Sequence, residues 1–311
     1  MARKKKSTEA SPDAIPQQSS SRRIMRGARP LAGKVIGISV SQSRDIENYG
    51  YTSWDVNRVT VRLSEALLNA GARLVFGHDW RHDGIMAAIC GLAIKSHVSD
   101  DENSGPLIQN FLAYPDQTSL PPERKRDLRR RELVHINQIE PVGVYTSQDS
   151  KLKRAVALSR MRYEMNKVID ARICIGGKRA GDDPDHPPSG FFPGVAEEAY
   201  WAAKTGTPLF ATQFLGGVAA ELIRTLDEES EQDKNANTRD SFVVTAGKEE
   251  LHAQAIESIG DVKEGGFKLP PADLKSVFKI RKLNRATKNL WSESSVAVDV
   301  DSFAAIVRQL K

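Results

Sequence analysis

The feature that most constrains the fold is a repeated order of apolar run, polar glycine-containing turn and helix. Apolar runs rich in β-branched residues predict buried strands, and apolar residues at helical spacing predict helices packed against them. Before residue 95 the order occurs twice, as strand 33–40 and helix 54–69, then strand 72–77 and helix 85–94. Neighbouring parallel strands need such crossovers, so the alternation predicts a parallel sheet with helices on its faces.

The second half of the chain continues this alternation. The predicted elements are a helix at 150–169, a strand at 173–177, a helix at 193–205, a strand at 207–211 and helices at 216–226, 251–259 and 303–310. Between the halves, 97–119 shows no clear period, and 133–145 has room for one or two strands. The predicted fold class is therefore Rossmann-like α/β, a three-layer sandwich with a mainly parallel sheet and helices on both faces.

The helix predicted at 150–169 has an apolar stripe that would face the core. Its members are Leu158, Met161, Met165, Val168 and Ile169. Arg160, Arg162 and Glu164 lie off this stripe, near the end of the helix that leads into the next strand.

Length and charge suggest how the chain is divided. The 311 residues, 40% of them hydrophobic, are enough for a substantial core. Eight basic and two acidic residues fall within 1–30, so this segment carries +6 and the remainder −1 of the net +5. We predict a disordered basic tail at 1–30 and one domain at 31–311, with a core at 34–226 and a C-terminal extension at 240–311. A nucleic-acid-binding arm is the alternative reading of the tail.

The sequence also bears on the compartment. No apolar run approaches the roughly 18 residues that a membrane-spanning helix needs, and the N-terminus lacks the apolar region of a secretory signal. The two cysteines, Cys90 and Cys174, each lie inside an apolar segment. These observations predict a cytoplasmic protein with no membrane partner, whose cysteines are buried free thiols.

Residues with ligand-binding chemistry gather at the turns after the predicted strands. In a parallel sheet these turns meet beyond the carboxyl ends of the strands, where ligands bind. The candidates are Ser39 and Ser41 after the first strand, Gly77, Asp79, Arg81, Asp83 and Gly84 after the second, and Gly176, Gly177 and Lys178 after the strand at 173–177. Glycines let the backbone approach a ligand, and a serine hydroxyl can hold a phosphate or equally cap its own turn.

The turn after the second predicted strand has a second reading. Asp79, His82 and Asp83 crowd together and resemble a metal-binding cluster. Residues this close on a turn point in different directions, and no second ligand motif accompanies them. We therefore favour direct ligand contact from this turn and predict no metal and no cofactor.

The helix predicted to begin at Pro193 carries Gly194 and two adjacent carboxylates, Glu197 and Glu198, close to its start. Free N–H groups at a helix start attract anions, which makes this region a candidate for ligand binding. The alternative is that the glutamates only complement the helix dipole, a contribution of under about 1 kcal/mol.

Several common site motifs are absent from the sequence. No Gly-x-x-x-x-Gly-Lys-Ser/Thr loop is present, which counts against an NTPase, and no Gly-x-Gly-x-x-Gly follows the first strand, which counts against dinucleotide redox chemistry. There is also no serine elbow and no Cys/His pair at an informative spacing.

Taken together, two stretches resemble a known family. Val75-Phe76-Gly77 with Gly84-Ile85-Met86-Ala87-Ala88 resembles the second-strand turn and helix of LOG and lysine-decarboxylase-like proteins. Gly176-Gly177 and Gly194-Val195-Ala196-Glu197-Glu198 resemble the two halves of their Pro-Gly-Gly-x-Gly-Thr-x-x-Glu signature, here separated by residues 178–193. The resemblance covers roughly 34–226 and is closest to the wider SLOG superfamily, relatives of LOG and DprA-like proteins.

The resemblance implies candidate catalytic residues. LOG enzymes pair an arginine of the preceding helix with the signature glutamate to cleave an N-glycosidic bond. Here Glu198 falls at the signature position, with Glu197 beside it, and the spacing offers Arg160 or Arg162 without choosing between them. A glutamate can stabilise or attack an oxocarbenium-like sugar, while an arginine can hold a phosphate or ribose. The signature threonine is replaced by Val195, which removes a hydroxyl that could hold a phosphate.

The resemblance also implies a function. Many SLOG proteins are thought to bind nucleotides or nucleotide-derived signals in defence and stress systems, and the inserted 178–193 segment favours sensing over cleavage here. The first alternative is an N-glycoside hydrolase acting on nucleoside monophosphates or related nucleotides. The second is a nucleic-acid-binding protein that uses its basic tail. A sensor without an attached effector domain implies an effector protein as partner, and related proteins suggest a homo-oligomer.

Overall fold

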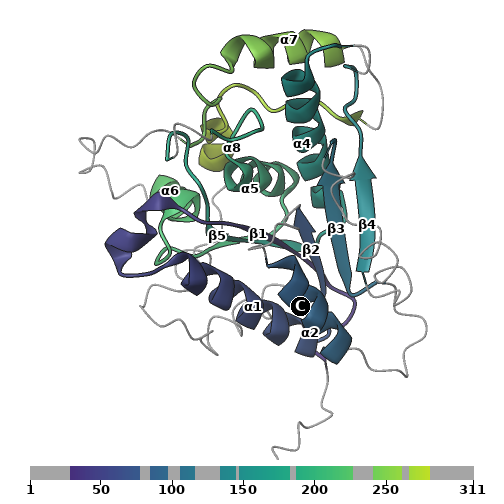
Figure 1. Cartoon of the computed structure of the whole chain (residues 1–311), viewed down its shortest axis with the longest axis vertical. Helices are drawn as coiled ribbons and strands as arrows, with labels where there is room; N and C mark the ends of the chain where they lie inside the picture. Colours follow the sequence, from purple (N-terminus) through teal and green to yellow (C-terminus); the bar gives the residue numbers. More distant parts are fainter. Residues whose placement is uncertain are drawn as a thin grey trace, which may run out of the picture.

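Six parallel strands form a single sheet in the computed structural model of the chain (Figure 1). The structure describes residues 29–77, 85–96, 106–115, 134–144, 147–182, 187–226, 241–260 and 266–280. The strands are β1 (Val35–Ser41), β2 (Arg73–Gly77), β3 (Ile108–Ala113), β4 (Val134–Ile139), β5 (Ala171–Gly176) and β6 (Leu209–Ala211). Their order across the sheet is β4-β3-β2-β1-β5-β6, and every pairing is parallel.

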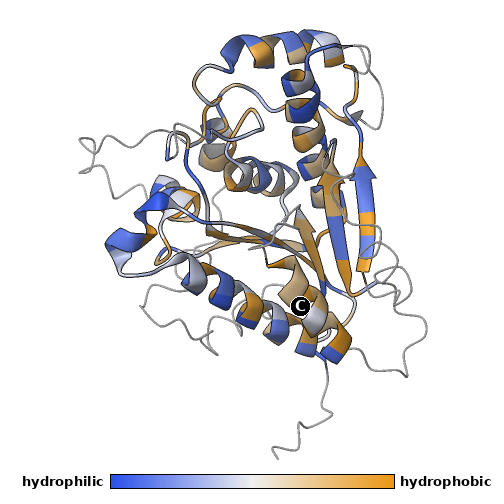
Figure 2. Ribbon diagram, viewed as in Figure 1, coloured by the Kyte–Doolittle hydropathy of each residue, from blue (hydrophilic) through white to orange (hydrophobic). Residues whose placement is uncertain are grey.

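The helices cover both faces of this sheet, which confirms the predicted three-layer α/β sandwich (Figure 1). On one face lie the 3-10 helix η1 (Arg44–Tyr49), α1 (Ser53–Asn69) and α2 (Met86–Ser96). The opposite face carries α4 (Ser150–Lys167), α5 (Gly194–Thr205) and α6 (Gly217–Leu226), with α7 (Glu249–Ile259) and α8 (Lys275–Ile280) packed beside them. Hydrophobic residues concentrate on the strands and on the sheet-facing sides of the helices (Figure 2).

The topology reverses direction beside β1. From β1 the chain builds outward through β2, β3 and β4, then returns to β5 on the other side of β1. In register, Ser39 lies opposite Cys174 and Ser41 opposite Gly176. Ligands of open α/β sheets bind beyond the carboxyl ends of the strands at such a switch point. We therefore expect a ligand site near the carboxyl ends of β1, β2 and β5.

Two predictions about secondary structure differ from the structure at short elements. The segment 97–119, which shows no clear period, contains β3, and the polar loop before α1 contains η1. In β3, Asn110 is a buried polar residue whose amide donates to the carbonyl oxygens of Phe76 and Gly77 at 3.4 and 3.2 Å. A buried amide that is hydrogen-bonded to the neighbouring strand interrupts the apolar pattern without disrupting the sheet.

The predicted apolar stripe of α4 is partly wrong. Leu158, Met161, Met165 and Ile169 are buried, but Val168 is 38% exposed because α4 ends at Lys167 and Val168 is the residue that caps it. The reverse error concerns Arg162, which lies off the stripe and is nevertheless buried. Two layers cover α4, since the sheet packs on one side and α5 on another, so more than one stripe of the helix is buried.

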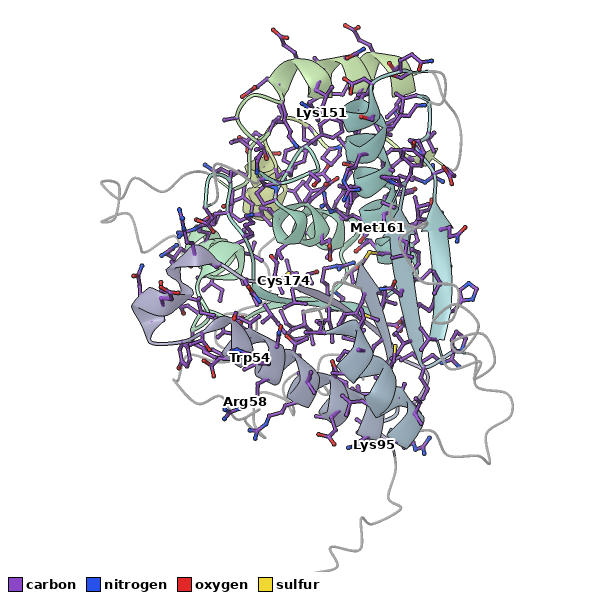
Figure 3. All side chains as sticks on the ribbon, in the orientation of Figure 1. Trp54, Arg58, Lys95, Lys151, Met161 and Cys174 are labelled. Carbon is purple, nitrogen blue, oxygen red and sulfur yellow. The ribbon has the colours of Figure 1, made fainter. Side chains whose placement is uncertain are left out.

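Both cysteines are free and buried, as predicted. Figure 3 shows Met161 and Cys174 inside the molecule between the sheet and its helices, while Trp54 and Arg58 project outward from α1. Among the described helices, none is long and apolar enough to cross a membrane. The predicted tail at 1–30 and the predicted helix at 303–310 lie outside the described residues, except for the last two residues of the tail.

Candidate functional site

Two consecutive glutamates near the start of α5 each pair with a different buried arginine. Glu197 accepts a hydrogen bond from Nη1 of Arg162, which reaches across from α4. Glu198 accepts one from Nη1 of Arg172, which comes from β5, with the Nη1–Oε2 distance 2.6 Å. Successive helix residues point in directions about 100° apart, so one helix start can serve two partners on different elements. The first ion pair links α4 to α5, and the second links β5 to α5.

Ser39 completes the second pair. Its hydroxyl donates to Oε2 of Glu198 at 2.5 Å and accepts from Nη1 of Arg172 at 2.8 Å. The three side chains thus form a closed triangle around one carboxylate oxygen. Glu198 is 8% exposed and Arg172 is 0% exposed. Charges buried to this degree are tolerated in proteins when they are paired and hydrogen-bonded, which is the arrangement found here.

Glycines make room for both guanidinium groups. A Cβ on Gly190 would lie 2.8 Å from Nη1 of Arg162, and one on Gly194 would lie 3.2 Å from its Nη2. In the same way, a Cβ on Gly37 of β1 would lie 3.3 Å from Cζ of Arg172. At Gly190 and Gly194 the guanidinium of Arg162 is the nearest group, whereas at Gly37 two atoms of Ile169, at 3.0 and 3.2 Å, lie nearer than Arg172. Gly194 of the signature therefore has a structural reason that does not involve a ligand.

A small cavity of about 160 Å³ opens beside these pairs at the ends of β1 and β2. Its polar lining consists of Ser39, Arg162 and Glu198, together with the backbone at Gly77. The rest of its wall is apolar and is made of Ile38, Val40, Phe76, Ile85, Leu158 and Met161. Four residues predicted as ligand-binding or catalytic from separate parts of the sequence therefore meet in one cavity.

The other glycine turn forms a second group of predicted residues. The N–H of Gly177 donates to the carbonyl oxygen of Ser41 at 2.8 Å, and the N–H of Lys178 donates to the Ser41 hydroxyl at 2.9 Å. Gly176 has φ +60°, and a Cβ on it would lie 2.7 Å from the Ser41 carbonyl oxygen. These N–H groups are used within the protein. Gly176 lets β5 approach β1, and Gly177 leaves room for α6, because a Cβ on it would lie 2.8 Å from Cβ of Val218.

A network of charged groups fixes the same loop to α6. Arg179 pairs with Asp45 at 3.2 Å, with Asp182 at 3.2 Å and with Glu221 at 3.5 Å. Asp45 also accepts a hydrogen bond from the N–H of Gly217 at the start of α6. The α6 N-terminus is thus already occupied by a carboxylate of the chain itself. Burial raises the pKa of Glu221, with Arg179 acting in the opposite direction.

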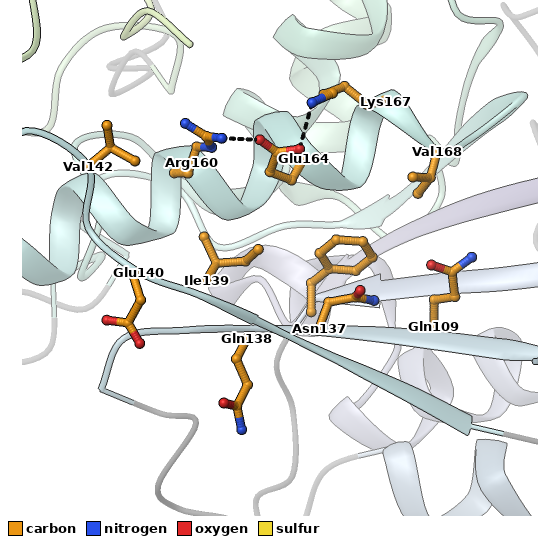
Figure 4. Close-up of a pocket in the computed structure, with 11 residues that line it drawn as sticks. Gln109, Asn137, Gln138, Ile139, Glu140, Val142, Arg160, Glu164, Lys167 and Val168 are labelled. Carbon is orange, nitrogen blue, oxygen red and sulfur yellow. Dashed lines mark ion pairs between the residues drawn. The ribbon is translucent and has the colours of Figure 1, made fainter. Parts of the chain in front are cut away.

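Arg160 and Arg162, which the sequence left as equal candidates, lie in different surroundings. Arg160 pairs with Glu164 of its own helix at 2.6 Å, and Lys167 pairs with Glu164 at 2.9 Å. These three residues line a separate groove of about 630 Å³ between α4 and the edge strands β3 and β4, shown in Figure 4. Of the two arginines, only Arg162 lines the cavity that Glu198 lines.

The C-terminal extension supports the loop that precedes α5. Nζ of Lys248 donates to the carbonyl oxygens of Pro188 and Gly190, the latter at 2.8 Å. The N–H of Thr245 donates to the carbonyl oxygen of Phe191 at 2.8 Å. Burial lowers the pKa of Lys248 to about 8, and the charge of Arg162 acts in the same direction. The extension therefore holds in place the loop against which Arg162 packs.

The sequence analysis missed Arg172, which binds the predicted glutamate more directly than Arg162 does. The available signal was an arginine within the apolar run 171–176, and the structure adds that this arginine lies opposite Gly37 of β1. Asp79, Arg81, Asp83 and Gly84 lie outside the described residues, so their predicted role as ligand contacts stays a prediction. Within the described residues, no group of three His, Cys, Asp or Glu side chains is placed to hold a metal ion.

The sheet order defines an α/β protein of the Rossmann-like class, and the small cavity lies at the carboxyl ends of β1 and β2. The family model described as SLOG cluster2 matches residues 30–252, so the chain belongs to this family. This match confirms the predicted membership of the SLOG superfamily. No curated protein and no solved structure matched the chain. Family membership indicates a nucleotide-related function in general.

Proposed function

We propose that this protein binds a nucleotide or nucleotide-derived signal, with part of the ligand in the cavity formed by Ser39, Gly77, Arg162 and Glu198. The observation that carries the proposal is the convergence of these residues, from β1, β2, α4 and α5, at the carboxyl end of the sheet. A cavity of about 160 Å³ is smaller than the roughly 300 Å³ at which sites for whole drug-sized ligands begin. It is therefore suited to one moiety of a nucleotide, with the remainder outside.

The carboxylates favour binding over cleavage. Glycoside hydrolases commonly use two carboxyl groups at the bond that breaks. Among the described residues that line the cavity, Glu198 is the only one with a carboxylate. Glu197 is 0% exposed and turned toward Arg162, which leaves it unable to reach a ligand in the cavity without breaking that pair. This arrangement supports a sensor.

Isothermal titration against ATP, NAD, ADP-ribose and cyclic nucleotides tests the proposal. We expect saturable binding of at least one of them, weakened at least tenfold by Glu198→Gln. Glu164→Gln is the matched control because Glu164 is also paired with a basic residue but lines the other groove. Absence of heat across the whole panel would count against the proposal.

A second candidate function is N-glycoside hydrolysis of nucleoside monophosphates or related nucleotides. The observation in its favour is a glutamate at the family signature position that lines a cavity together with an arginine. Incubation of the wild type with each nucleoside monophosphate, followed by chromatography for free base, separates cleavage from binding. Release that is abolished by Glu198→Gln supports hydrolysis, and release that survives this substitution removes Glu198 as the catalytic residue.

A further inference from the structure

We propose that Arg172 is a positioning residue that compensates the charge of the buried Glu198 and fixes its carboxylate so that one oxygen, Oε1, can accept a hydrogen bond from the ligand. This inference rests on the proposed function, because it specifies what the same cavity recognises. Arg172 does not line the cavity, so it acts on a ligand through Glu198 and Ser39, which it contacts and which do line the cavity.

The geometry divides the two oxygens of Glu198 between protein and cavity. Oε2 accepts from both Ser39 and Arg172, at 2.5 and 2.6 Å. No described residue donates to Oε1, although Glu198 lines the cavity. Because Ser39 and Arg172 are also bonded to each other, at 2.8 Å, rotation of the carboxylate would break two contacts at once. The orientation of Glu198 is therefore set by the protein before any ligand arrives.

Arg172 has no other ion-pair partner in the described part of the chain. It is fully buried, and its Nε and Nη2 atoms have no hydrogen-bond partner among the described residues. A buried guanidinium is strongly unfavourable unless a carboxylate compensates it. A Cβ on Gly37 of β1 would lie 3.3 Å from Cζ of Arg172, with two atoms of Ile169 nearer still, at 3.0 and 3.2 Å. These features are explained if the function of Arg172 is to hold Glu198 in place and compensate its charge.

An ionised glutamate selects the chemistry of the group that enters the cavity. A carboxylate only accepts hydrogen bonds, so its ligand partner must be a donor such as a sugar hydroxyl. The ionised oxygens of a phosphate are hydrogen-bond acceptors as well, so they cannot pair with Oε1. Arg162 is already paired with Glu197. The cavity is therefore expected to take the sugar of the nucleotide, while the phosphates remain outside.

The first test needs no ligand. Free energies of unfolding in urea would be measured from pH 5 to 8 for the wild type, Arg172→Met, Arg172→Lys, Glu198→Gln and the double variant Arg172→Met/Glu198→Gln. In Arg172→Met the uncompensated Glu198 must bind a proton to remain buried, so the folded state holds more protons than the unfolded state. Its stability relative to wild type should then fall as pH rises, by up to about tenfold in the unfolding equilibrium constant per pH unit.

The other variants identify the cause of that slope. The double variant has no charge to compensate and should lose the slope, and Arg172→Lys should lack it because a positive charge remains. If Arg172→Met shows the same pH dependence as the wild type, Arg172 does not control the ionisation of Glu198 and the inference is overturned. If Arg172→Met does not fold at any pH, the double variant decides. A fall in its stability relative to wild type as pH rises would overturn the inference.

The second test uses ADP-ribose and inorganic phosphate as probes in isothermal titration. We expect ADP-ribose to bind the wild type and Arg172→Lys, with at least tenfold weaker binding to Arg172→Met, and no competition by phosphate at millimolar concentration. Binding to folded Arg172→Met at wild-type strength would contradict a positioning role. If the wild type binds no nucleotide of the panel, the proposed function fails while the pH series still decides the role of Arg172.

Discussion

Arg160 and Arg162 are two residues apart on one helix and pair with glutamates in both cases, but the two pairs are built differently. Arg160 pairs within α4 at the rim of an open groove, beside Lys167 (Figure 4). Arg162 crosses to α5, where its partner Glu197 is fully buried. The side chains of the first pair are 15% and 19% exposed, and Glu164 has Lys167 as a second partner, whereas Glu197 is fully buried against Arg162. Whether an arginine of α4 belongs to the site therefore depends on the elements packed around it. The spacing along the helix does not distinguish Arg160 from Arg162.

The largest effect that we expect is a difference in the free energy of unfolding between the variants that remove these two ion pairs. Arg162→Met would leave Glu197 buried without a partner, which typically lowers the free energy of unfolding by about 3–5 kcal/mol. Arg160→Met would remove an i,i+4 pair within one helix and leave Glu164 paired with Lys167, so a loss of about 1 kcal/mol or less is expected. Urea unfolding of both variants at pH 7 measures the comparison. Equal losses would show that burial does not distinguish the two arginines.

The glycines beside Arg162 provide the next effect. Gly190→Ala and Gly194→Ala place a methyl group 2.8 and 3.2 Å from its guanidinium nitrogens, so a loss of about 1–3 kcal/mol is expected from overpacking. Gly91→Ala is the matched control, since Gly91 lies in α2 with nothing within 4 Å of the added methyl group. It should stabilise the protein by about 0.5–1 kcal/mol, because alanine favours a helix interior over glycine. Thermal unfolding of the three variants tests this, and stabilisation by all three would refute the account of the signature glycine.

A smaller, pH-dependent effect concerns Lys248, which supports the loop beside Arg162. Its pKa is lowered to about 8, below the ordinary value of 10.5, so between these values the unfolded state binds more protons than the folded state. Stability conferred by this group should therefore rise as pH increases from 8 to 10. The measurement is the difference in unfolding free energy between wild type and Lys248→Met at pH 8 and pH 10. A difference that stays constant or shrinks would contradict the burial of this ammonium group.

The smallest expected signal is at Cys174, which lies on β5 beside Ser39 and Arg172. Burial raises its pKa to about 12, with the charge of Arg172 acting in the opposite direction. Since the thiolate is the reactive form, iodoacetamide at pH 8.5 should leave Cys174 unmodified in the folded protein and label it after unfolding. Peptide mass spectrometry reads the outcome. Rapid labelling of the folded protein would mean that the interior beside the site is open to solvent.

The layered fold could be predicted from the sequence because its signals are local. The apolar runs of β1 and β2 and the helical period of α1 depend on neighbouring residues alone. β3 has six residues, including Gln109 and the buried Asn110, so its apolar signal is too weak to separate from a loop. Strand existence there depends on pairing with β2, which is a contact distant in sequence.

The site was predictable in part for the same reason. Turn position and motif spacing brought Ser39, Gly77, Arg162 and Glu198 into consideration, and the structure places them at one cavity. The partners of the glutamates could not be predicted, because Arg172 looks like a misplaced charge until Gly37 is known to lie opposite it. A charged residue inside an apolar strand can therefore be accommodated where the neighbouring strand has a glycine opposite it.

The most direct test of the central claim is a crystal structure of the protein soaked with the nucleotide that gives the largest heat in titration. The account predicts density for its sugar between Ser39, Gly77 and Glu198, with a hydroxyl within hydrogen-bond distance of Glu198 Oε1. Density confined to the groove beside Arg160, or a bound nucleotide that makes no contact with Glu198, would contradict it.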